Sequence, residues 1–255
     1  MISVSIIGAG NVAFHLSKAF YQSESIHLHQ IYSRSPLTEH YKNIQVPICH
    51  SLEELKEADV YIISVSDDAV IDIASQLPFE KKLVVHTTGS VSLQDLPSKN
   101  RRGVFYPLQT FSKNKKVALS KVPFCLEADE ENDLETLKSL ATAISHSVYE
   151  IDSEQRKTIH LAAVFVSNFV NHIYHITKDI SDQKNIPFQI FQPLMEETLD
   201  KLQYLSPLEA QTGPARRNDQ QTIDKHLSLL DNETYKNLYQ QFTTSILKTY
   251  ERKEL

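Results

Sequence analysis

The chain has 255 residues, enough for one large domain or two of ordinary size, and 41% of them are hydrophobic, which allows a proper core. A net charge of -6 and a pI of about 6.0 argue against a general nucleic-acid-binding protein, which usually presents a basic face. No secretion signal opens the chain, no apolar run approaches the roughly 18 residues of a membrane span, and two widely separated cysteines indicate free thiols, so we expect a cytoplasmic protein.

The first half alternates between strand-like and helix-like segments. Short apolar runs rich in β-branched residues predict strands at 3–8, 26–33, 59–65, 82–88, 101–107, 122–128 and 146–152. Amphipathic segments between them predict helices at 11–22, 51–58, 67–77 and 131–145. This alternation is typical of βαβ units, so we expect an α/β fold with a doubly wound, mostly parallel Rossmann sheet.

The pattern changes near residue 152, after which no convincing strand occurs. The segment 153–184 predicts one long helix, and its stretch from Ile159 to Val170 is apolar almost all round, which implies burial in a core or an interface. The segments 221–230 and 233–253 predict the last two helices. Four prolines punctuate the helices between them: Pro187, Pro193, Pro207 and Pro214. We therefore expect a Rossmann domain at 1–151 and an all-helical domain at 152–255.

Two of the five glycines, Gly8 and Gly10, directly follow the first predicted strand. The segment Gly8-Ala9-Gly10-Asn11-Val12-Ala13 has the G-x-G-x-x-A pattern of a dinucleotide-binding turn between a strand and a helix. We expect Gly8 to permit the tight turn, Gly10 to let a pyrophosphate approach, and Ala13 to let the helix pack on the strand. The helix N-terminus would favour the anion. The alternative is an ordinary βα turn that uses glycine.

The end of the second predicted strand bears on which dinucleotide is bound. An NAD site usually has an acidic residue about 20 residues past the glycines, but no acid occurs between Glu24 and Glu39. The chain instead has Ser33 and Arg34 there, a hydroxyl and a guanidinium that suit a 2′-phosphate. We therefore predict NADP rather than NAD, with a surface arginine in a turn as the alternative.

Two further strand ends are expected to line the cofactor cleft, because ligands of open α/β sheets lie across the carboxyl ends of the strands. One is followed by Ser64-Val65-Ser66-Asp67-Asp68 and the other carries His86-Thr87-Thr88. Asp67 or Asp68 equally suits an N-cap of the next helix. The predicted cofactor-binding residues are Gly8, Gly10, Asn11, Val12, Ala13, Ser33, Arg34, Val65, Ser66, Asp67, His86 and Thr87.

Several segments together carry a family resemblance. They are IIGAGNVA, SVSDDAV, VVHTTGS, GVFYPLQTFS, HLAAVFVSNFVNHI and LSPLEAQTGPARRNDQQTIDKHL, and they extend to about residue 227. The chain resembles a bacterial family of Rossmann-like oxidoreductases with a helical C-terminal domain of unknown function. That family is similar to deazaflavin-dependent NADP reductases, pyrroline-carboxylate reductases and β-hydroxyacid dehydrogenases.

The resemblance implies an NADP-binding fold, a helical second domain like that of 6-phosphogluconate dehydrogenase, and homodimerisation through that domain. It implies no substrate. In the β-hydroxyacid dehydrogenases a catalytic lysine precedes a substrate-binding asparagine by one turn. The residue one turn before Asn168 here is Val164, and this departure counts against hydroxyacid oxidation by the lysine mechanism.

Three groups of residues are candidates for the substrate site. His160 and Asn168, eight residues apart on the long helix, would lie on neighbouring parts of one face. With His86, they are the predicted catalytic residues, and the alternative is that their polar groups are satisfied within a core or between subunits. Tyr106 and Gln109 follow the predicted strand 101–107 and would contact the substrate, although Tyr106 is equally suited to packing.

The third group, Arg216 and Arg217, precedes a predicted helix with Asn218 as its N-cap. Arginines beside a helix start form a good anion site, so Arg216, Arg217 and Asp219 are predicted substrate-binding residues, with inter-domain salt bridges as the alternative. His226, in that helix, is expected to point back toward this site.

A spacing that suits a metal on one helix face occurs at His172, His175 and Asp179. No fourth ligand is evident and no H-E-x-x-H motif occurs, so we predict no metal site.

The sequence thus predicts an NADP-dependent reductase or dehydrogenase acting on a small, anionic carbonyl or imine, with His160 or His86 as proton donor. The alternative is a non-catalytic NADP(H)-binding regulator or scaffold with the same fold, because fold alone does not determine function. Neither pyrroline-carboxylate nor arogenate or prephenate chemistry is indicated by a specific motif.

Overall fold

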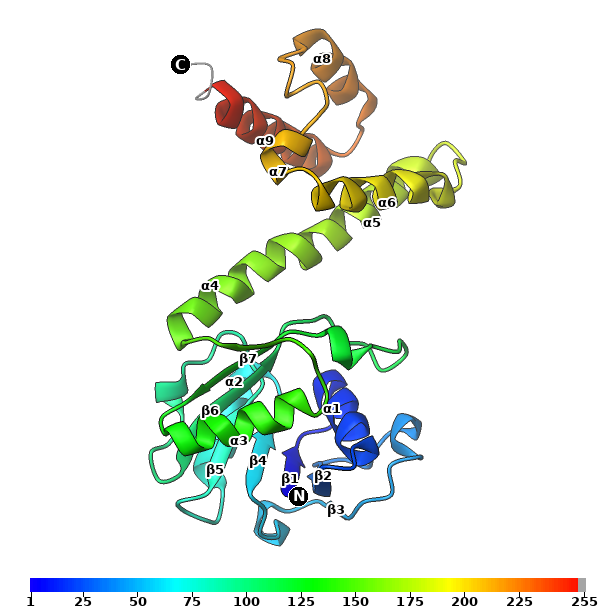
Figure 1. The fold of residues 1–255 in the computed structure, drawn as a ribbon. Coiled ribbons are helices and arrows are strands. Elements are labelled where there is room, and N and C mark those ends of the chain that lie inside the picture. The colour runs from blue at the N-terminus through cyan, green and yellow to red at the C-terminus, as the bar shows by residue number, and fades with distance from the viewer. Residues whose placement is uncertain (252–255) are drawn as a thin grey trace. The chain divides into compact units, whose positions relative to one another are not determined.

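The computed structural model describes residues 1–251 and has two compact units, Met1–Ser167 and a second that begins at Asn168 (Figure 1). The strands, all in the first unit, are β1 (Ile2–Ile7), β2 (Ile26–Tyr32), β3 (Ile48–Cys49), β4 (Val60–Ile63), β5 (Leu83–His86), β6 (Arg101–Pro107), β7 (Phe124–Ala128) and β8 (Val148–Glu150). They form one sheet in the order β3-β2-β1-β4-β5-β6-β7-β8. Neighbouring strands are parallel except for β6 and β7, so the predicted mostly parallel Rossmann sheet is confirmed.

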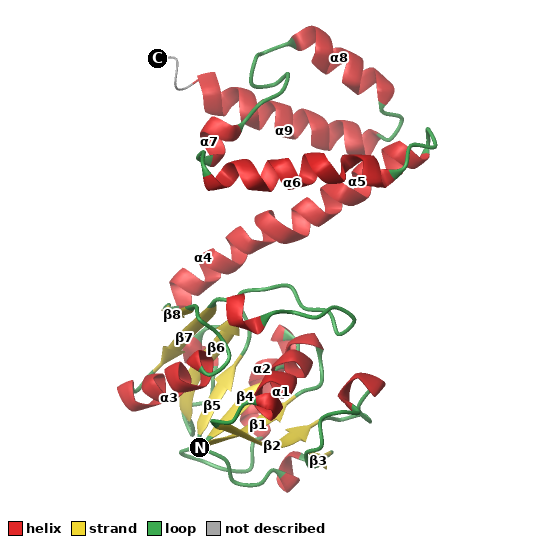
Figure 2. Cartoon of the chain, turned by 45° about the vertical axis from the view of Figure 1, so that its right-hand side comes forward, coloured by secondary structure: helices red, strands yellow, loops and turns green. Residues whose placement is uncertain are grey.

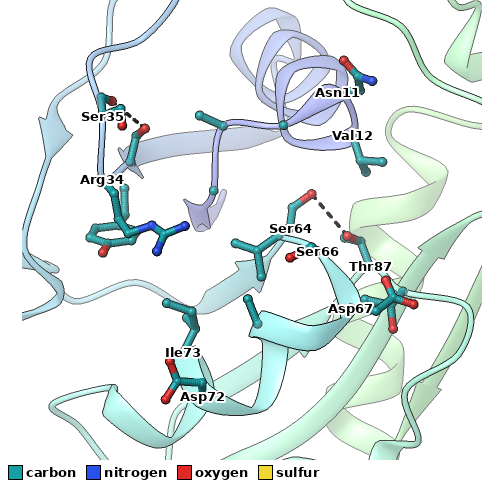
Figure 3. Close-up of a pocket in the computed structure, with 18 residues that line it drawn as sticks. Asn11, Val12, Arg34, Ser35, Ser64, Ser66, Asp67, Asp72, Ile73 and Thr87 are labelled. Carbon is teal, nitrogen blue, oxygen red and sulfur yellow. Dashed lines mark hydrogen bonds between the residues drawn. The ribbon is translucent and has the colours of Figure 1, made fainter.

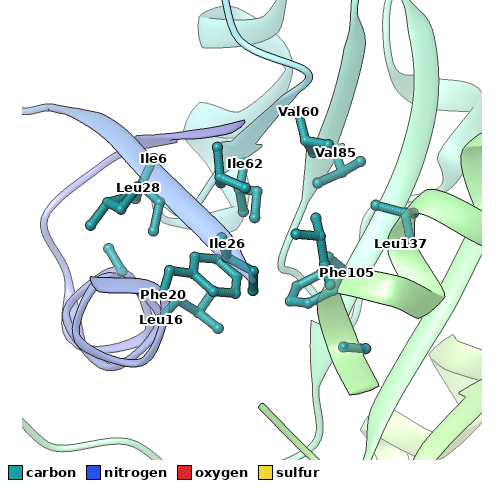
Figure 4. Close-up of a cluster of buried hydrophobic side chains, with 14 of the residues drawn as sticks. Ile6, Leu16, Phe20, Ile26, Leu28, Val60, Ile62, Val85, Phe105 and Leu137 are labelled. Atoms are coloured by element: carbon teal, nitrogen blue, oxygen red, sulfur yellow. The ribbon is translucent and has the colours of Figure 1, made fainter. Parts of the chain in front are cut away.

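Helices cover both faces of this sheet. On one face, α1 (Asn11–Gln22) and α3 (Glu131–Thr142) pack their apolar side chains on the central strands (Figure 4). Phe20 and Phe105 are completely buried there, and each contributes roughly 1.5–3 kcal/mol of transfer free energy. On the other face, α2 (Asp67–Gln76) covers a second apolar cluster. A third and smaller cluster, around Val104 and Tyr106, packs against Ile159 of α4 (Ser153–Ala163).

The predicted helix at 51–58 is wrong, because only one 3₁₀ turn forms, at Leu52–Glu54. The backbone that follows this turn is held by side chains from two strands instead of by helical bonds. The Lys56 N–H donates to Gln30 Oε1, and the Tyr61 hydroxyl donates to the Lys56 carbonyl while accepting from the Ala58 N–H. The two-residue strand β3, just before this turn, was not predicted, because two residues show no periodicity.

The elements of the second unit are helices (Figure 2). They are α5 (Val170–Asp182), α6 (Gln192–Asp200), α7 (Pro207–Ala210), α8 (Gln220–Leu229) and α9 (Glu233–Glu251). Pro193 and Pro207 stand in the first turns of α6 and α7, where a missing N–H costs nothing. Of the predicted last helix, residues 252–253 lie outside the described residues. None of the described helices is both long and apolar enough to cross a membrane.

The predicted long helix contains an irregular stretch. A π-helical segment, Val164–Phe169, lies between α4 and α5, and such segments often occur at functional sites. In the stretch predicted to be apolar almost all round, Ile159 packs on the sheet unit, but Leu161 is 61% and Val166 77% exposed. Burial in a core of this chain, one of the two expectations for this stretch, is therefore wrong. The strands end at Glu150, whereas the compact units divide at residues 167 and 168, so the predicted domains 1–151 and 152–255 stay a prediction.

Candidate functional site

A cavity of about 540 Å³ opens beyond the carboxyl ends of β1, β2, β4 and β5 (Figure 3). The sheet order reverses between β1 and β4, and open α/β sheets bind their ligands at such a point. Ten predicted cofactor residues line this cavity: Gly8, Gly10, Asn11, Val12, Ser33, Arg34, Val65, Ser66, Asp67 and Thr87. Ser64 and Thr88, which belong to the two loops expected at the cleft, also line it, and the lining residues that sequence reasoning missed are Ala9, Tyr32, Ser35, Ala69, Asp72 and Ile73. Ala69 and Ile73 are four residues apart on α2, and this helical spacing was the available signal.

The two glycines of the first turn have different reasons to be glycine. Gly8 has a φ of +124°, and a Cβ there would lie 2.2 Å from the carbonyl oxygen of Ser64, so the turn against β4 excludes any side chain. A Cβ at Gly10 would meet nothing within 4 Å, so this side of the turn is open. Ala13, which does not line the cavity, is completely buried where α1 packs on the sheet.

The N-terminus of α1 is free to bind an anion. Its N-cap is Gly10, which has no side chain to accept from the first N–H groups, and no acidic residue occurs in the first turn. These N–H groups and the helix dipole therefore favour a phosphate in the space beside Gly10.

The loop after β2 supplies the cationic side of the cavity. Figure 3 shows the guanidinium of Arg34 directed into the cavity. The Ser33 hydroxyl donates to the carbonyl of Ser35 at 2.7 Å and so holds the loop in shape. Asp72 also lines the cavity, but within residues 1–251 no ion pair joins it to Arg34. The guanidinium is therefore available to a phosphate.

The loops after β4 and β5 are tied together. The Thr87 hydroxyl donates to Ser64 Oγ at 3.2 Å (Figure 3), and the Ser90 hydroxyl donates to the carboxylate of Asp67. The predicted capping of α2 by Asp67 or Asp68 is wrong, because Ser66 is the N-cap and both aspartates stand in the first helical turn. Their negative charges still stabilise α2, because they lie at the positive, N-terminal end of the helix dipole.

His86 lies beneath the cavity and does not line it. Its side chain is completely buried, and burial, with a smaller contribution from Arg156, lowers its pKa to about 3. The Thr88 N–H donates to His86 Nδ1 at 3.2 Å, so Nε2 carries the proton and has no hydrogen-bond partner. A group this buried is poorly suited to exchanging protons with a substrate.

His160 lies on α4, within the same compact unit, and contacts two other elements. The Tyr106 hydroxyl of β6 is 3.0 Å from His160 Nδ1. A Cβ at Gly89 would lie 2.4 Å from the same nitrogen, so the ring packs directly on the backbone of the loop after β5. Thr87 and Thr88 of that loop line the cavity. The candidate proton donor therefore adjoins the loop that borders the dinucleotide site.

A buried ion pair that sequence reasoning missed fixes the start of α4. Arg156 is completely buried and bonds to the carboxylate of Glu127 and to the carbonyl of Val91, the latter at 2.6 Å. Glu127 also accepts from the hydroxyl of Ser153 at 2.8 Å. From sequence, an arginine in an amphipathic helix is expected to be solvent-exposed. Only the tertiary structure shows that Arg156 is buried with Glu127.

Two further predicted site residues, Gln109 and Asn168, belong to different compact units. Gln109 is exposed, and its side-chain oxygen accepts from the Thr110 N–H at 2.8 Å. Asn168 is the first residue of the second unit and is exposed in the π-helical segment. The regular α-helical spacing that placed His160 and Asn168 on one face does not hold across that segment.

In the second unit, the arginine loop lies at the start of α8. Arg216 and Arg217 are exposed, and the Arg216 guanidinium lies 4.1 Å from the centre of the Tyr250 ring. The predicted N-cap Asn218 is wrong, because Asp219 caps α8 by accepting from the Thr222 N–H at 3.1 Å. His226 Nδ1 hydrogen-bonds the Tyr239 hydroxyl at 2.8 Å, so its ring is held by α9.

His172, His175 and Asp179 lie on α5, where His175 Nε2 is 3.7 Å from Asp179. Asp179 also accepts from the Tyr235 hydroxyl at 2.7 Å. Within the described part of the chain, no group of three or more histidine, cysteine or acidic residues has the geometry to hold a metal.

Comparisons with known proteins place these observations in a family. Residues 3–89 match the family described as NADP oxidoreductase, coenzyme F420-dependent, and residues 122–246 match a domain of unknown function, DUF2520. A Bacteroides fragilis protein with the provisional name NADP oxidoreductase is 38% identical, with a TM-score of 0.86 over 97% of this chain and 98% of that one. A comparison with curated proteins gives no match.

Two more distant solved structures share the fold. Protein TM1727 from Thermotoga maritima is 22% identical, with a TM-score of 0.74 over 99% of this chain and 100% of that one. Pyrroline carboxylate reductase from Plasmodium falciparum, crystallised with NADP bound, is 13% identical, with a TM-score of 0.61 over 98% and 97% of the two chains. The open turn, the uncapped helix and Arg34 fit the dinucleotide of this family, NADP.

Proposed function

Because the chain belongs to the family of NADP oxidoreductases that carry this C-terminal domain of unknown function, we propose that it is an NADP-dependent reductase or dehydrogenase. The substrate is a small, anionic carbonyl or imine. The observation that carries the proposal is the open N-terminus of α1 in a cavity that also holds a free guanidinium, Arg34. Both are features that bind phosphate, and in the proposed binding mode one takes the pyrophosphate of NADP and the other its 2′-phosphate.

In this proposal each loop around the cavity has one task. The N–H groups of Asn11 and Val12 hold the pyrophosphate beside Gly10, and Arg34 binds the 2′-phosphate within the loop that Ser33 shapes. Val65, Ser66 and Asp67 line the wall opposite α1, and Thr87 lies toward the nicotinamide. When bound, NADPH supplies a hydride to the substrate carbon.

The substrate oxygen or nitrogen must gain a proton when its carbon gains the hydride. We assign this proton transfer to His160, because its side chain is half-buried and adjoins the loop that borders the cavity. His86 has the lesser claim because of its burial and lowered pKa. Tyr106 and Gln109 stay candidate substrate residues, and Asn168 stays a candidate catalytic residue.

The helical domain supplies the rest of the proposal. Arg216 and Arg217, with Asp219 shaping their loop, would bind a carboxylate of the substrate. Exposed apolar side chains support homodimerisation through this domain, among them Ile190 and Leu194, each 65% exposed. The two buried free cysteines support a reducing compartment, the cytoplasm.

Fluorescence titration of the full chain with NADPH and NADH tests the proposal. We expect NADPH to bind the more tightly, and Arg34→Ala to weaken NADPH by about tenfold to a hundredfold, the worth of one hydrogen-bonded charge pair, without changing NADH. Lys116→Ala removes an exposed cationic charge outside the cavity and is the matched control. Equal, millimolar binding of both dinucleotides would contradict the proposal.

Turnover distinguishes the enzyme from a non-catalytic NADP(H)-binding regulator. Small carbonyl acids and cyclic imines are the probes, and the Plasmodium falciparum neighbour is named for a cyclic imine, pyrroline carboxylate. Tight NADPH binding without oxidation of NADPH by any of these probes would favour the regulator.

A further inference from the structure

The ring of His160 lies between Tyr106 and Gly89. The proposed proton transfer gives neither of these two residues a role. On one side, the Tyr106 hydroxyl lies 3.0 Å from Nδ1, and the two rings meet edge to face at an interplanar angle of 76°. On the other side, Gly89 leaves room for the ring, because a Cβ there would lie 2.4 Å from Nδ1 and 2.5 Å from Cγ. The imidazole therefore has one favoured position.

The Tyr106 hydroxyl distinguishes the two nitrogens of this imidazole. Tyr106 is buried, and burial raises its pKa to about 12, so it remains a phenol near neutral pH. Beside a neutral imidazole the phenol donates to Nδ1, which places the ring proton on Nε2. Beside an imidazolium the phenol oxygen accepts from the Nδ1–H. In both states Nδ1 is occupied, and no partner for Nε2 is found in the described part of the chain.

Tyr106 and His160 both belong to elements that neighbouring contacts hold in place. Tyr106 pairs with Cys125 within the β6–β7 ladder, with a further pair on each side. The α4 helix that carries His160 begins with a reciprocal cap between Asp152 and Gln155. One turn before His160, Arg156 bonds to the carbonyl of Val91, two residues beyond Gly89. The helix and the Gly89 loop are thereby fixed to each other, as the precision of a catalytic group requires.

We propose that Tyr106 and Gly89 are positioning residues that fix the ring and tautomer of His160 so that Nε2 is its proton-transferring atom. This inference rests on the proposed reductase function. It differs from a substrate-contact role for Tyr106, because Tyr106 acts only through His160. Gly89 has no positive φ, so its need for glycine is the closeness of the imidazole alone.

The proton balance follows from this arrangement. His160 begins as the imidazolium, with its Nδ1–H donated to the Tyr106 oxygen. As the hydride bonds to the substrate carbon, the Nε2–H bond breaks and the proton bonds to the substrate oxygen or nitrogen. The product is an alcohol or amine, the dinucleotide leaves as NADP⁺, and the imidazole is neutral with its proton on Nδ1. Solvent then returns a proton to Nε2 and restores the imidazolium. Where the ring is neutral at rest, this imidazolium has lost its Nδ1 proton to solvent, Nε2 keeps its proton, and Tyr106 donates to Nδ1.

Nuclear magnetic resonance of the full chain with ¹⁵N-labelled histidine tests the inference without a substrate. His160→Gln identifies the signals of His160. In the neutral ring of the wild type we expect Nδ1 to be unprotonated and Nε2 protonated in at least about nine molecules of ten. In Tyr106→Phe we expect the mixture of tautomers to approach that of a histidine side chain free in solution. A wild-type ring protonated at Nδ1, or a tautomer ratio unchanged by Tyr106→Phe, would overturn the inference.

Tyr41→Phe is the matched control, because Tyr41 is a buried tyrosine of the same unit whose hydroxyl has no hydrogen-bond partner. It should leave the His160 signals unchanged. A change as large as that of Tyr106→Phe would show that the signals report general packing and would also overturn the inference.

A double-mutant cycle tests Gly89. Gly89→Ala should lower Tm by about 4–8 °C in the wild type, a typical effect of overpacking in a chain of this size. In the His160→Ala background the same substitution should shift Tm by less than about 2 °C, because the clashing ring is gone. Equal shifts in both backgrounds would overturn the role of Gly89.

Kinetics separates this inference from the proposed function. With 1-pyrroline-5-carboxylate as probe, Tyr106→Phe should lower kcat by about tenfold or more and leave the NADPH dissociation constant within about twofold. Failure of the wild type to bind NADPH would remove the proposed function while leaving the tautomer result to stand. An unchanged kcat in Tyr106→Phe, with wild-type turnover, would contradict the positioning role alone.

Discussion

The sheet unit and the helical unit bury their apolar side chains to very different degrees. All three clusters of buried apolar side chains in the described residues are centred in the sheet unit, where residues such as Ile6, Phe105 and Leu137 are completely buried. Of the nineteen large apolar side chains exposed within residues 1–251, twelve belong to the helical unit, beginning with Phe169. Its few buried apolar residues are Ala210, Ala215, Ile223 and Tyr250.

The two units therefore obtain their stability in different ways. A sheet covered by helices on both faces closes its own core. Single helices with one apolar stripe need a further surface to cover that stripe. We therefore expect substitutions in the sheet unit to act on folding and those on the exposed faces of the helical unit to act on assembly.

The sharpest test compares one glycine from each unit. Gly8 and Gly213 both have a positive φ, but a Cβ would meet the Ser64 carbonyl only at Gly8. Gly8→Ala should cost about 4 kcal/mol of unfolding free energy, from backbone strain plus the clash. Gly213→Ala should cost about 1–2 kcal/mol from strain alone. Urea unfolding followed by circular dichroism measures both, and equal costs would contradict the assignment of a close contact to Gly8 only.

The second test concerns assembly. Ile190→Asp combined with Leu194→Asp places two charges four residues apart on an apolar face of the helical unit. We expect the dissociation constant of the proposed dimer to rise about a hundredfold or more, equivalent to about 3 kcal/mol, because two apolar side chains no longer become buried. Analytical ultracentrifugation measures the change.

Tyr149→Asp is the control for this assembly test, because Tyr149 is 53% exposed on the sheet unit. It should leave the dimer intact. Dissociation by Tyr149→Asp and not by the double variant would reverse the comparison between the units.

The last test concerns the dependence of stability on pH, where the effect expected within any one pH unit is the smallest of the three. The pKa of His86 falls from 6.5 to about 3 on folding, so below pH 6.5 the unfolded chain binds a proton that the folded chain excludes. Stability therefore falls as pH decreases from 6.5 toward 3, by up to about 1.4 kcal/mol per pH unit. His86→Asn keeps an acceptor for the Thr88 N–H and should lose this component.

The control for the pH test is His27→Asn, which removes an exposed imidazole and leaves His86 in place. Its unfolding free energy should keep the wild-type dependence on pH. A His86→Asn variant with the same dependence as the wild type would show that His86 is not the source.

Much of the fold could be predicted because its signals are local. Strand β6 and helix α1 were predicted with the bounds that the structure shows, since apolar runs and helical spacing are read directly from neighbouring residues. The failure at 51–58 has the opposite origin. There the backbone of a good helical pattern bonds to the side chain of Gln30, which is 26 residues from Lys56, and to the hydroxyl of Tyr61 on the strand that follows.

The residues of the candidate site also fall into two groups, those that the sequence predicts and those that only the tertiary structure reveals. The G-x-G-x-x-A turn and Arg34 could be found because motif spacing and the absence of an acid are properties of the sequence. Arg156 and Glu127 could not, because nothing in a surface-like helical pattern indicates that a charge will be buried with its partner. The contact of Gly89 with His160 was equally hidden, because the two residues are 71 positions apart.

By itself, therefore, the sequence determined the Rossmann class, the dinucleotide turn and the preference for NADP, because short-range periodicity and spacing carry that information. The tertiary structure alone decided the environment of each histidine. It buried His86 beneath the cavity and placed His160 between Tyr106 and Gly89. The physical reason is that burial and hydrogen bonding depend on which distant segments pack together, and these set the proton chemistry of an imidazole more than its neighbours in the chain do.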